Sequence, residues 1–404
     1  TYTGDGINLG ANTMTLSGGG TLVSGGLTLN DPSSMLLLNS ITVDSVSTTS
    51  YSLGLDVDAD STVTSLLVAH ITPVSIANTK SLSGAITLTA GSIKLNETGT
   101  LASSISMSGG VLDADNSLTV SGTLTHTGNI TLDVAETKTL TYTGDAISLG
   151  ANTMTLSGGG SLNNTNALVL SEPDSKLLLN SISLDSVSTT SDSLGLDVDA
   201  DSTVTSLTVA NITPVAIVSG SSLSGGITLT AGSLNLSEAG TLASTISMSG
   251  GVLDADESST VSGALSHTAD ITIDVAETKT LTYSGAAISV GANTLTLSGG
   301  GSLVSGGLTL NDPSSMLLLN SITVDSVSTT SYSLGLDIDA DSTVTSLLVA
   351  NITPVSIANT KSLSGAITLT AGSIKLDETG TLASTVEMSG GTLDTDESLT
   401  VSGA

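Results

Sequence analysis

The stretch "ITLTAGSIKLNETGTLASS" at residues 86–104 is followed directly by "ISMSGGVLDADNSLTVSGT" at 105–123, and the two align along their whole length. Each contains three short runs with an apolar residue at every second place, and Gly, Asn, Asp or Ser separates the runs. Such alternation places Leu, Ile and Val on one face of a strand and Thr, Ser and Asp on the other. Three strands in about 20 residues predict one coil of a β-solenoid, which stacks on the next coil at roughly 4.8 Å.

A longer period contains these coils. "TYTGDGINLGANTMTLSGGG" at 1–20 returns with small changes at 141–160 and at 282–301. The chain therefore divides into three tandem solenoid repeats, 1–140, 141–281 and 282–404, and the third stops before its period closes. We expect one continuous all-β rod without helices. The prolines of the first repeat, Pro32 and Pro73, should lie in corners or small loops, because proline cannot donate to a strand ladder.

The composition supports a narrow interior. The 404 residues include no Phe, Trp or Cys and only five Tyr, yet 38% of them are hydrophobic. A thick globular core normally contains large aromatic rings, so their absence fits a thin aliphatic core. The lack of cysteine excludes a disulfide framework, and no apolar run is long enough to insert into a membrane.

The charge is strongly negative. Asp and Glu number 37 against seven basic residues, which gives a formal net charge of −30. Such a surface repels nucleic-acid phosphates and anionic lipids, so we expect neither as a partner. It suits a highly soluble surface, or one that is neutralised by divalent cations.

Runs such as "TLTLSGGGSLVSGGLTLN" at 294–311 resemble the Gly-, Ser- and Thr-rich strand repeats of bacterial autotransporter passengers and filamentous-haemagglutinin-type adhesins. Those proteins are secreted right-handed β-helices. The resemblance covers nearly the whole chain and is one of composition and rhythm. It implies a bacterial protein that is extracellular or displayed on the cell surface.

Three alternating aspartates recur in "LGLDVDADSTVTSL" at 53–66 and in its two sister copies. A helix-flanked calcium loop that began at Asp56 would need Gly and Glu where the chain has Ser61 and Leu67, so that interpretation fails. A strand with its adjoining corner fits better, with Leu53, Leu55, Val57, Ala59 and Val63 inward and the aspartates outward. The candidate metal ligands are the nine aspartates of the three copies: Asp56, Asp58, Asp60, Asp197, Asp199, Asp201, Asp337, Asp339 and Asp341.

A second acidic rank follows further along each repeat. Its members are Asp113 and Asp115, then Asp254, Asp256 and Glu257, then Asp394, Asp396 and Glu397. Acidic rows on adjacent coils or filaments can share calcium through oxygen ligands, but solvated acidic faces are common. Both interpretations stay open. No cofactor is required.

Catalytic residues are not evident, and we predict that the chain is not an enzyme. Only three histidines occur, His70, His126 and His267. Asn replaces His70 in both sister repeats, and the other two fall at outward strand positions, where a solvated side chain is expected. Lys138 and Lys279 follow "DVAET" and are expected to pair with Glu136 and Glu277.

The sequence thus predicts the structural shaft of an extracellular fibre, sheath or surface adhesin that associates with itself, head to tail or laterally. The alternative is an ice-binding or glycan-binding solenoid. Thr-x-Thr pairs such as Thr87 and Thr89 favour ice binding, although the pairs do not fall at one fixed place in successive coils and strand propensity explains most of them. A β-helix polysaccharide enzyme is a remote third interpretation, because Arg and Trp are both absent.

Overall fold

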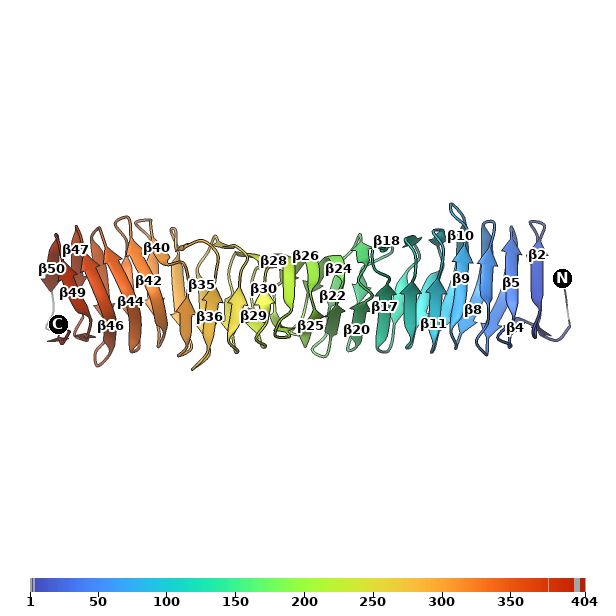
Figure 1. The fold of residues 1–404 in the computed structure, drawn as a ribbon, viewed down its shortest axis with the longest axis horizontal. Coiled ribbons are helices and arrows are strands. Elements are labelled where there is room, and N and C mark those ends of the chain that lie inside the picture. Colours follow the sequence, from blue (N-terminus) through green and yellow to red (C-terminus); the bar gives the residue numbers. More distant parts are fainter. Residues whose placement is uncertain (1, 3, 377, 396–399, 404) are drawn as a thin grey trace. The chain divides into compact units, whose positions relative to one another are not determined.

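The computed structural model describes residues 2, 4–376, 378–395 and 400–403. The chain divides into two compact units, Thr1–Thr205 and Ser206–Ala404, and β26 (Ser202–Val209) spans the boundary. In each unit the chain winds through parallel strands, with one coil taking about 20 residues (Figure 1). No helix occurs in the part of the chain that the structure describes. The predicted all-β solenoid is therefore confirmed.

Each unit has two parallel sheets, which we call sheet A and sheet B, and every complete coil contributes to both. In the first unit, sheet B contains β2 (Thr13–Ser17), β5 (Met35–Asn39), β7 (Gly54–Val57), β9 (Thr72–Ile76), β11 (Ser92–Leu95), β14 (Val111–Ala114), β17 (Ile130–Val134), β20 (Thr153–Ser157), β23 (Lys176–Asn180) and β25 (Gly195–Ala200). Sheet A of that unit contains β1 (Ile7–Asn8), β3 (Thr21–Leu22), β4 (Leu27–Leu29), β6 (Thr42–Thr48), β8 (Ser61–Val68), β10 (Ser81–Leu88), β12 (Thr100–Leu101), β13 (Ser104–Met107), β15 (Leu118–Val120), β16 (Leu124–His126), β18 (Thr139–Tyr142), β19 (Ile147–Ser148), β21 (Ser161–Asn164), β22 (Leu168–Leu170) and β24 (Ser183–Thr189).

The second unit repeats this plan. Its sheet B contains β27 (Ile212–Ile217), β29 (Ser233–Leu236), β32 (Val252–Ala255), β35 (Ile271–Val275), β38 (Thr294–Ser298), β41 (Met316–Leu319), β43 (Gly335–Ile338), β45 (Thr353–Ile357), β47 (Ser373–Leu376) and β50 (Thr392–Thr395). Its sheet A contains β28 (Ser222–Leu229), β30 (Thr241–Leu242), β31 (Thr245–Met248), β33 (Ser259–Val261), β34 (Leu265–His267), β36 (Thr280–Tyr283), β37 (Ile288–Ser289), β39 (Ser302–Val304), β40 (Leu308–Leu310), β42 (Thr323–Thr329), β44 (Ser342–Val349), β46 (Ser362–Leu369), β48 (Thr381–Leu382), β49 (Thr385–Met388) and β51 (Thr400–Val401).

The sheet A part of each coil is bent in the middle. In β8 the inward and outward residues alternate until Thr64 and Ser65, which are both exposed. Val63 pairs with Gly84 and Ser65 with Ala85, so Thr64 is an extra residue that changes the register. In other coils the bend breaks the strand in two, as in β12 and β13. The predicted three strands are present there, whereas in β8 and β10 the second and third strands are continuous.

The interior is a stack of aliphatic side chains. On sheet B of the first unit, Ile93, Leu112, Leu132 and Leu156 lie on one another in successive coils, and none is more than 2% exposed. Tyr142 occupies the same kind of position on sheet A, and its hydroxyl accepts a hydrogen bond of 3.0 Å from the Leu124 N–H. Coils this narrow are filled by Leu, Ile and Val, which accounts for the absence of Phe and Trp.

The two prolines of the first repeat differ from one another. Pro32 lies in a turn, as predicted, but Pro73 lies inside β9, so the prediction of a corner at Pro73 was wrong. The strand tolerates this proline because the ladder between β7 and β9 begins one residue later, at Leu55 and Val74. Opposite Pro73 stands Gly54, where a Cβ would lie 1.9 Å from the Pro73 carbonyl oxygen.

Gly84 should be essential to the bend. It has φ +121°, and an added Cβ would lie 1.8 Å from the Val63 carbonyl oxygen. We expect Gly84→Ala to lower the free energy of unfolding by about 2–4 kcal/mol, measured by urea unfolding followed by circular dichroism. Gly20→Ala is the matched control, because no atom lies within 4 Å of its added Cβ, and the change should stay within about 0.5 kcal/mol. Equal unfolding midpoints for the two variants would contradict this account of the bend.

Candidate functional site

The aspartate triplets are split between a strand and a corner. Asp56 lies on β7 and is half-buried, whereas Asp58 and Asp60 are exposed in the corner that follows. Asp337, Asp339 and Asp341 are arranged in the same way around β43. In the middle copy, Asp197 and Asp199 belong to β25, and Asp201 follows it. The predicted strand with its adjoining corner is thus confirmed for the first and third copies, but the three aspartates do not share one strand face there, because the chain turns after Val57 and Ile338.

The inward residues of the same stretch were mostly predicted correctly. Leu55, Val57 and Val63 are buried, as expected. Leu53 is 54% exposed instead of inward, because it still belongs to the preceding corner, and Ala59 lies in the corner after the strand.

The third aspartate of the triplet joins two coils. The Asp60 carboxylate accepts hydrogen bonds from the Ser81 backbone N–H, at 2.8 Å, and from the Ser81 hydroxyl, at 3.1 Å. Asp341 accepts a hydrogen bond of 2.9 Å from the Ser362 hydroxyl in the same manner. These aspartates hold the start of the next sheet A strand, which is a structural role.

The first aspartate carries an electrostatic cost. Burial raises the pKa of Asp56, and the negative charge of Asp58 raises it further. Asp337 shows the same direction, caused by burial and then by Asp339 and Glu378. In the middle copy, Asp197 is paired with Lys176 of the preceding coil, at 2.5 Å. Among the described residues, no group of three or more His, Cys, Asp or Glu side chains is arranged to hold a metal ion.

The second acidic rank lies on the outer face of sheet B and is held by a lysine in the first unit. Lys94 Nζ lies 3.2 Å from Asp113 and 2.7 Å from Asp115. Asp113 pairs in the ladder with Asp133 of the next coil, whose carboxylate accepts a hydrogen bond from Ser157. Burial raises the pKa of Asp113, and Lys94 opposes that shift.

The second repeat has the same cluster without the lysine. Asn235 takes the place of Lys94 and donates hydrogen bonds to Asp254, at 3.2 Å, and to Asp256, at 2.8 Å. Burial, followed by the charges of Asp256 and Asp274, raises the pKa of Asp254 to about 6. In the third repeat Lys375 pairs with Asp394 in the ladder, while Asp396 and Glu397 lie outside the described residues.

The hydroxyl side chains form rows on the outer face of sheet A. Thr87 stacks on Ser106, and Ser106 stacks on Thr125, so hydroxyls do fall at a fixed place in successive coils. Serine interrupts the threonines in this row, so the argument from the sequence against a continuous threonine rank agrees with the register. The Thr13 and Thr15 pair lies instead on sheet B, in β2.

The histidines are less exposed than predicted. His126 and His267 are half-buried, and the Nδ1 atom of each lies 3.1 Å from a backbone carbonyl oxygen, that of Gly128 or Ala269. His267 Nε2 also lies 3.0 Å from the Ser289 carbonyl oxygen. Backbone contacts of this kind join neighbouring parts of the coil, so the prediction of solvated side chains was wrong.

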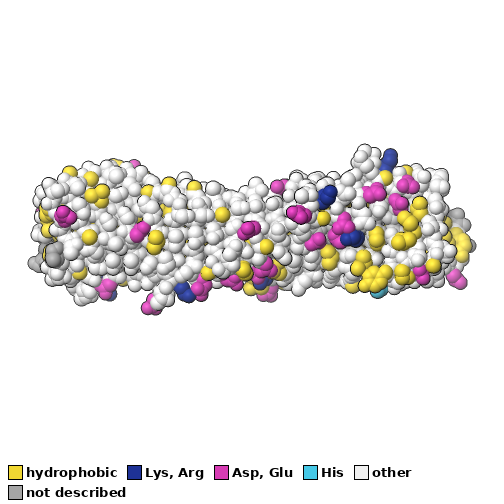
Figure 2. All heavy atoms as spheres, viewed as in Figure 1, with side chains coloured by type: hydrophobic (Ala, Val, Ile, Leu, Met, Phe, Trp, Pro, Cys, Tyr) yellow, Lys and Arg dark blue, Asp and Glu magenta, His cyan; other side chains and the backbone are white. Residues whose placement is uncertain are grey.

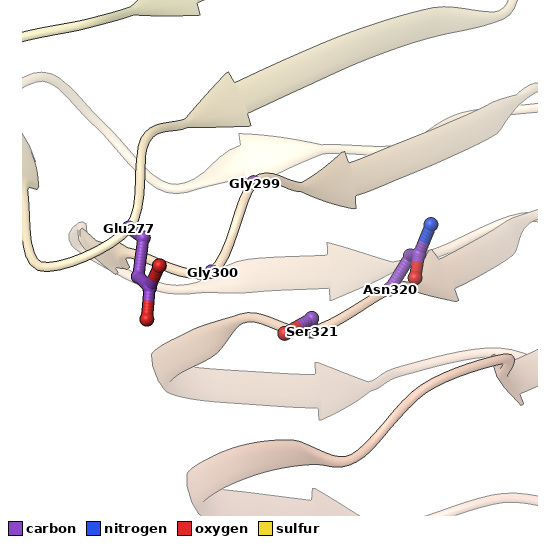
Figure 3. A pocket seen from close by; sticks show the side chains of 5 residues that line it. All are labelled: Glu277, Gly299, Gly300, Asn320 and Ser321. Carbon is purple, nitrogen blue, oxygen red and sulfur yellow. The ribbon is translucent and has the colours of Figure 1, made fainter.

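Open cavities recur at the corners where sheet B leads into sheet A. One of about 370 Å³ is lined by Glu136, Gly158, Gly159, Asn180 and Ser181. The second unit has one of about 400 Å³ at the matching place, lined by Glu277, Gly299, Gly300, Asn320 and Ser321 (Figure 3). Their linings come from three successive corners and contain no apolar side chain. We call them the corner cavities.

The lysines predicted to pair with Glu136 and Glu277 do not do so. Lys279 Nζ lies 2.7 Å from Glu257, on the preceding coil, so that prediction was wrong for Glu277. No ion pair joins Lys138 to Glu136 among the described residues either. The partner of a strand residue is set by the neighbouring coil, which the local sequence does not reveal.

Comparison with models of protein families, with curated proteins and with solved structures found no match to this chain. The described residues contain no helix that is long and apolar enough to cross a membrane.

The acidic cluster of the second unit should make stability depend on pH. The pKa of Asp254 is near 3.8 in the unfolded chain and about 6 in the folded chain. Between these values the folded state holds a proton that the unfolded state has lost, so protonation stabilises the fold. This contribution is fully present below about pH 4 and is lost as the pH rises through about 6.

We therefore expect Asp254→Asn to raise stability at about pH 7.5 by about 1–2 kcal/mol and to change it little at about pH 4.5, measured by thermal unfolding. Asn235→Lys, which copies Lys94, should lower the pKa of Asp254 and reduce the same pH dependence. Asp113→Asn is the control and should gain less, because Lys94 already offsets the charge there. A variant Asp254→Asn that melts at or below the wild-type temperature at pH 7.5 would contradict the assignment.

Proposed function

We propose that the chain is a structural, non-enzymatic shaft of an extracellular fibre, sheath or surface adhesin. The observation that carries the proposal is the in-register stacking of coils within each unit, with parallel ladders on sheets A and B around a buried aliphatic interior. The likeness in composition to secreted bacterial β-helices supports an extracellular location on a bacterial cell.

The stacked coils provide mechanical resistance. Bending or local unfolding of one coil breaks hydrogen bonds to both neighbours and exposes buried Leu, Ile and Val side chains. The short corners leave few flexible segments for a protease to enter. Acidic side chains on the exposed surface keep such a chain soluble (Figure 2).

The shaft should be visible in the purified chain. We expect negative-stain microscopy to show extended particles of uniform width, because stacked coils grow along one direction. Limited proteolysis should leave fragments that end at corners. Compact, rounded particles, or rapid digestion within the sheet B strands, would contradict the shaft.

Self-association is the second part of the proposal, and we assign it to sheet A. In the second unit the sheet A strands from β28 to β40 contain no Asp, Glu or Lys, whereas the sheet B strands over the same coils contain Asp254 and Asp274. Two chains with a net charge of −30 repel one another, and the repulsion is smallest where neutral faces meet. Calcium ions would add a second route, between the acidic rows of sheet B.

Paired variants distinguish the two faces. Thr228 and Ser266 flank Ser247 in one sheet A row, and Thr272 and Leu318 flank Thr296 in a sheet B row. With a calcium chelator present, the double variant Thr228→Asp with Ser266→Asp should lower the association constant at least tenfold, measured by sedimentation velocity. The double variant Thr272→Asp with Leu318→Asp should change it little. A wild-type chain that stays monomeric at every concentration and salt, or equal effects of both pairs, would overturn the sheet A assignment.

A further inference from the structure

The corner cavities are lined by exposed polar side chains that make no hydrogen bond within the described part of the fold. Glu277 and Asn320 line one cavity from different corners, and Ser321 completes it (Figure 3). Among the described residues, none of these side chains forms a hydrogen bond or ion pair, and the same holds for Glu136, Asn180 and Ser181 in the other cavity. Elsewhere on the corners, comparable side chains do have partners: Asp60 binds Ser81, and Asp341 binds Ser362.

Glycine creates the space. Both cavities have two glycines in the wall, at the corner that follows β20 or β38. At Gly158 and Gly299 an added Cβ would lie 2.3 Å from the carbonyl oxygen of Val134 or Val275, so a side chain at these positions would collide with the coil beneath. Because the corner packs against the preceding coil, only glycine fits at this part of the wall, and the polar side chains surround the space that it leaves.

The groups in the wall specify the ligand. A carboxylate accepts hydrogen bonds, an amide both donates and accepts them, and a hydroxyl does both, which matches a ligand with several hydroxyls. Volumes of about 370 and 400 Å³ fall within the roughly 300–1,000 Å³ of small-molecule sites. One carboxylate is too few for calcium, which takes roughly six to eight oxygens, and its charge disfavours an anion.

We propose that each corner cavity binds a sugar residue of a neutral polysaccharide. The inference goes beyond the shaft and does not depend on it, since a shaft with unoccupied corners is still a shaft. The matching cavities recur where one repeat meets the next, so a chain with several repeats offers several identical sites to a long polysaccharide with many identical sugars. Weak binding at each cavity then gives a stronger total affinity.

The test uses the full chain and three probes: dextran and mannan as neutral polysaccharides and alginate as an anionic one. We expect saturable binding of at least one neutral probe in isothermal titration calorimetry, with little change between low and moderate salt, and no binding of alginate. The double variant Glu136→Gln with Glu277→Gln preserves the shape of the cavities and should weaken binding at least tenfold, because hydrogen bonds to a carboxylate are stronger than those to an amide.

The matched control is Glu97→Gln with Glu238→Gln, which removes one exposed carboxylate from each unit outside the cavities. It should bind like the wild type. The proposal is overturned if neither neutral probe binds, if the two double variants bind equally, or if binding disappears on adding salt. Circular dichroism of all variants separates a loss of binding from a loss of the fold, and extended particles in the microscope would persist even if the cavities bind nothing.

Discussion

The rest of this structure depends on the parallel hydrogen-bonded ladder between successive coils. At a spacing of roughly 4.8 Å, every side chain lies directly on its counterpart in the next coil. The side chains of each such column must therefore pack against one another, and like charges within a column must be offset. Inward columns meet this demand with aliphatic residues, as Ile93, Leu112 and Leu132 show. Glycine is needed wherever a bend brings one coil onto the backbone of another, as at Gly84.

The same constraint makes stacked charges costly. Asp254 and Asp274 are ladder partners, and two unit charges at about 5 Å repel by about 1 kcal/mol in water and by a few kcal/mol near a protein surface. The first repeat relieves the corresponding stack with Lys94, while the second repeat has the neutral Asn235 there and leaves Asp254 with a raised pKa. One scaffold therefore holds two clusters of the same geometry that respond differently to pH.

Local patterns predicted the fold but not the partners. Alternation revealed the strands, and the repeat of about 20 residues revealed the coil, because both depend on neighbours in sequence. Three features that were not predicted depend on the register between coils. They are the fusion of two strands at Thr64, the place of Pro73 within β9 and the exposure of Leu53. The pairing of Lys279 with Glu257, 22 residues away, depends on register as well. The corner cavities were missed for the same reason, since their walls join three corners that lie far apart in the chain.

The corners are where this scaffold can acquire a function. Residues inside the ladder are committed to pairing and packing, so a change there disturbs the coils above and below. A corner side chain such as Glu136 or Glu277, which forms no hydrogen bond or ion pair with the described residues, is under no such demand, and its identity can follow a ligand instead. Asp60 shows the other outcome, in which a corner carboxylate has become a link between coils. The contrast between Asp60 and Glu277 on corners of one solenoid separates residues that maintain the stack from residues that are available to bind.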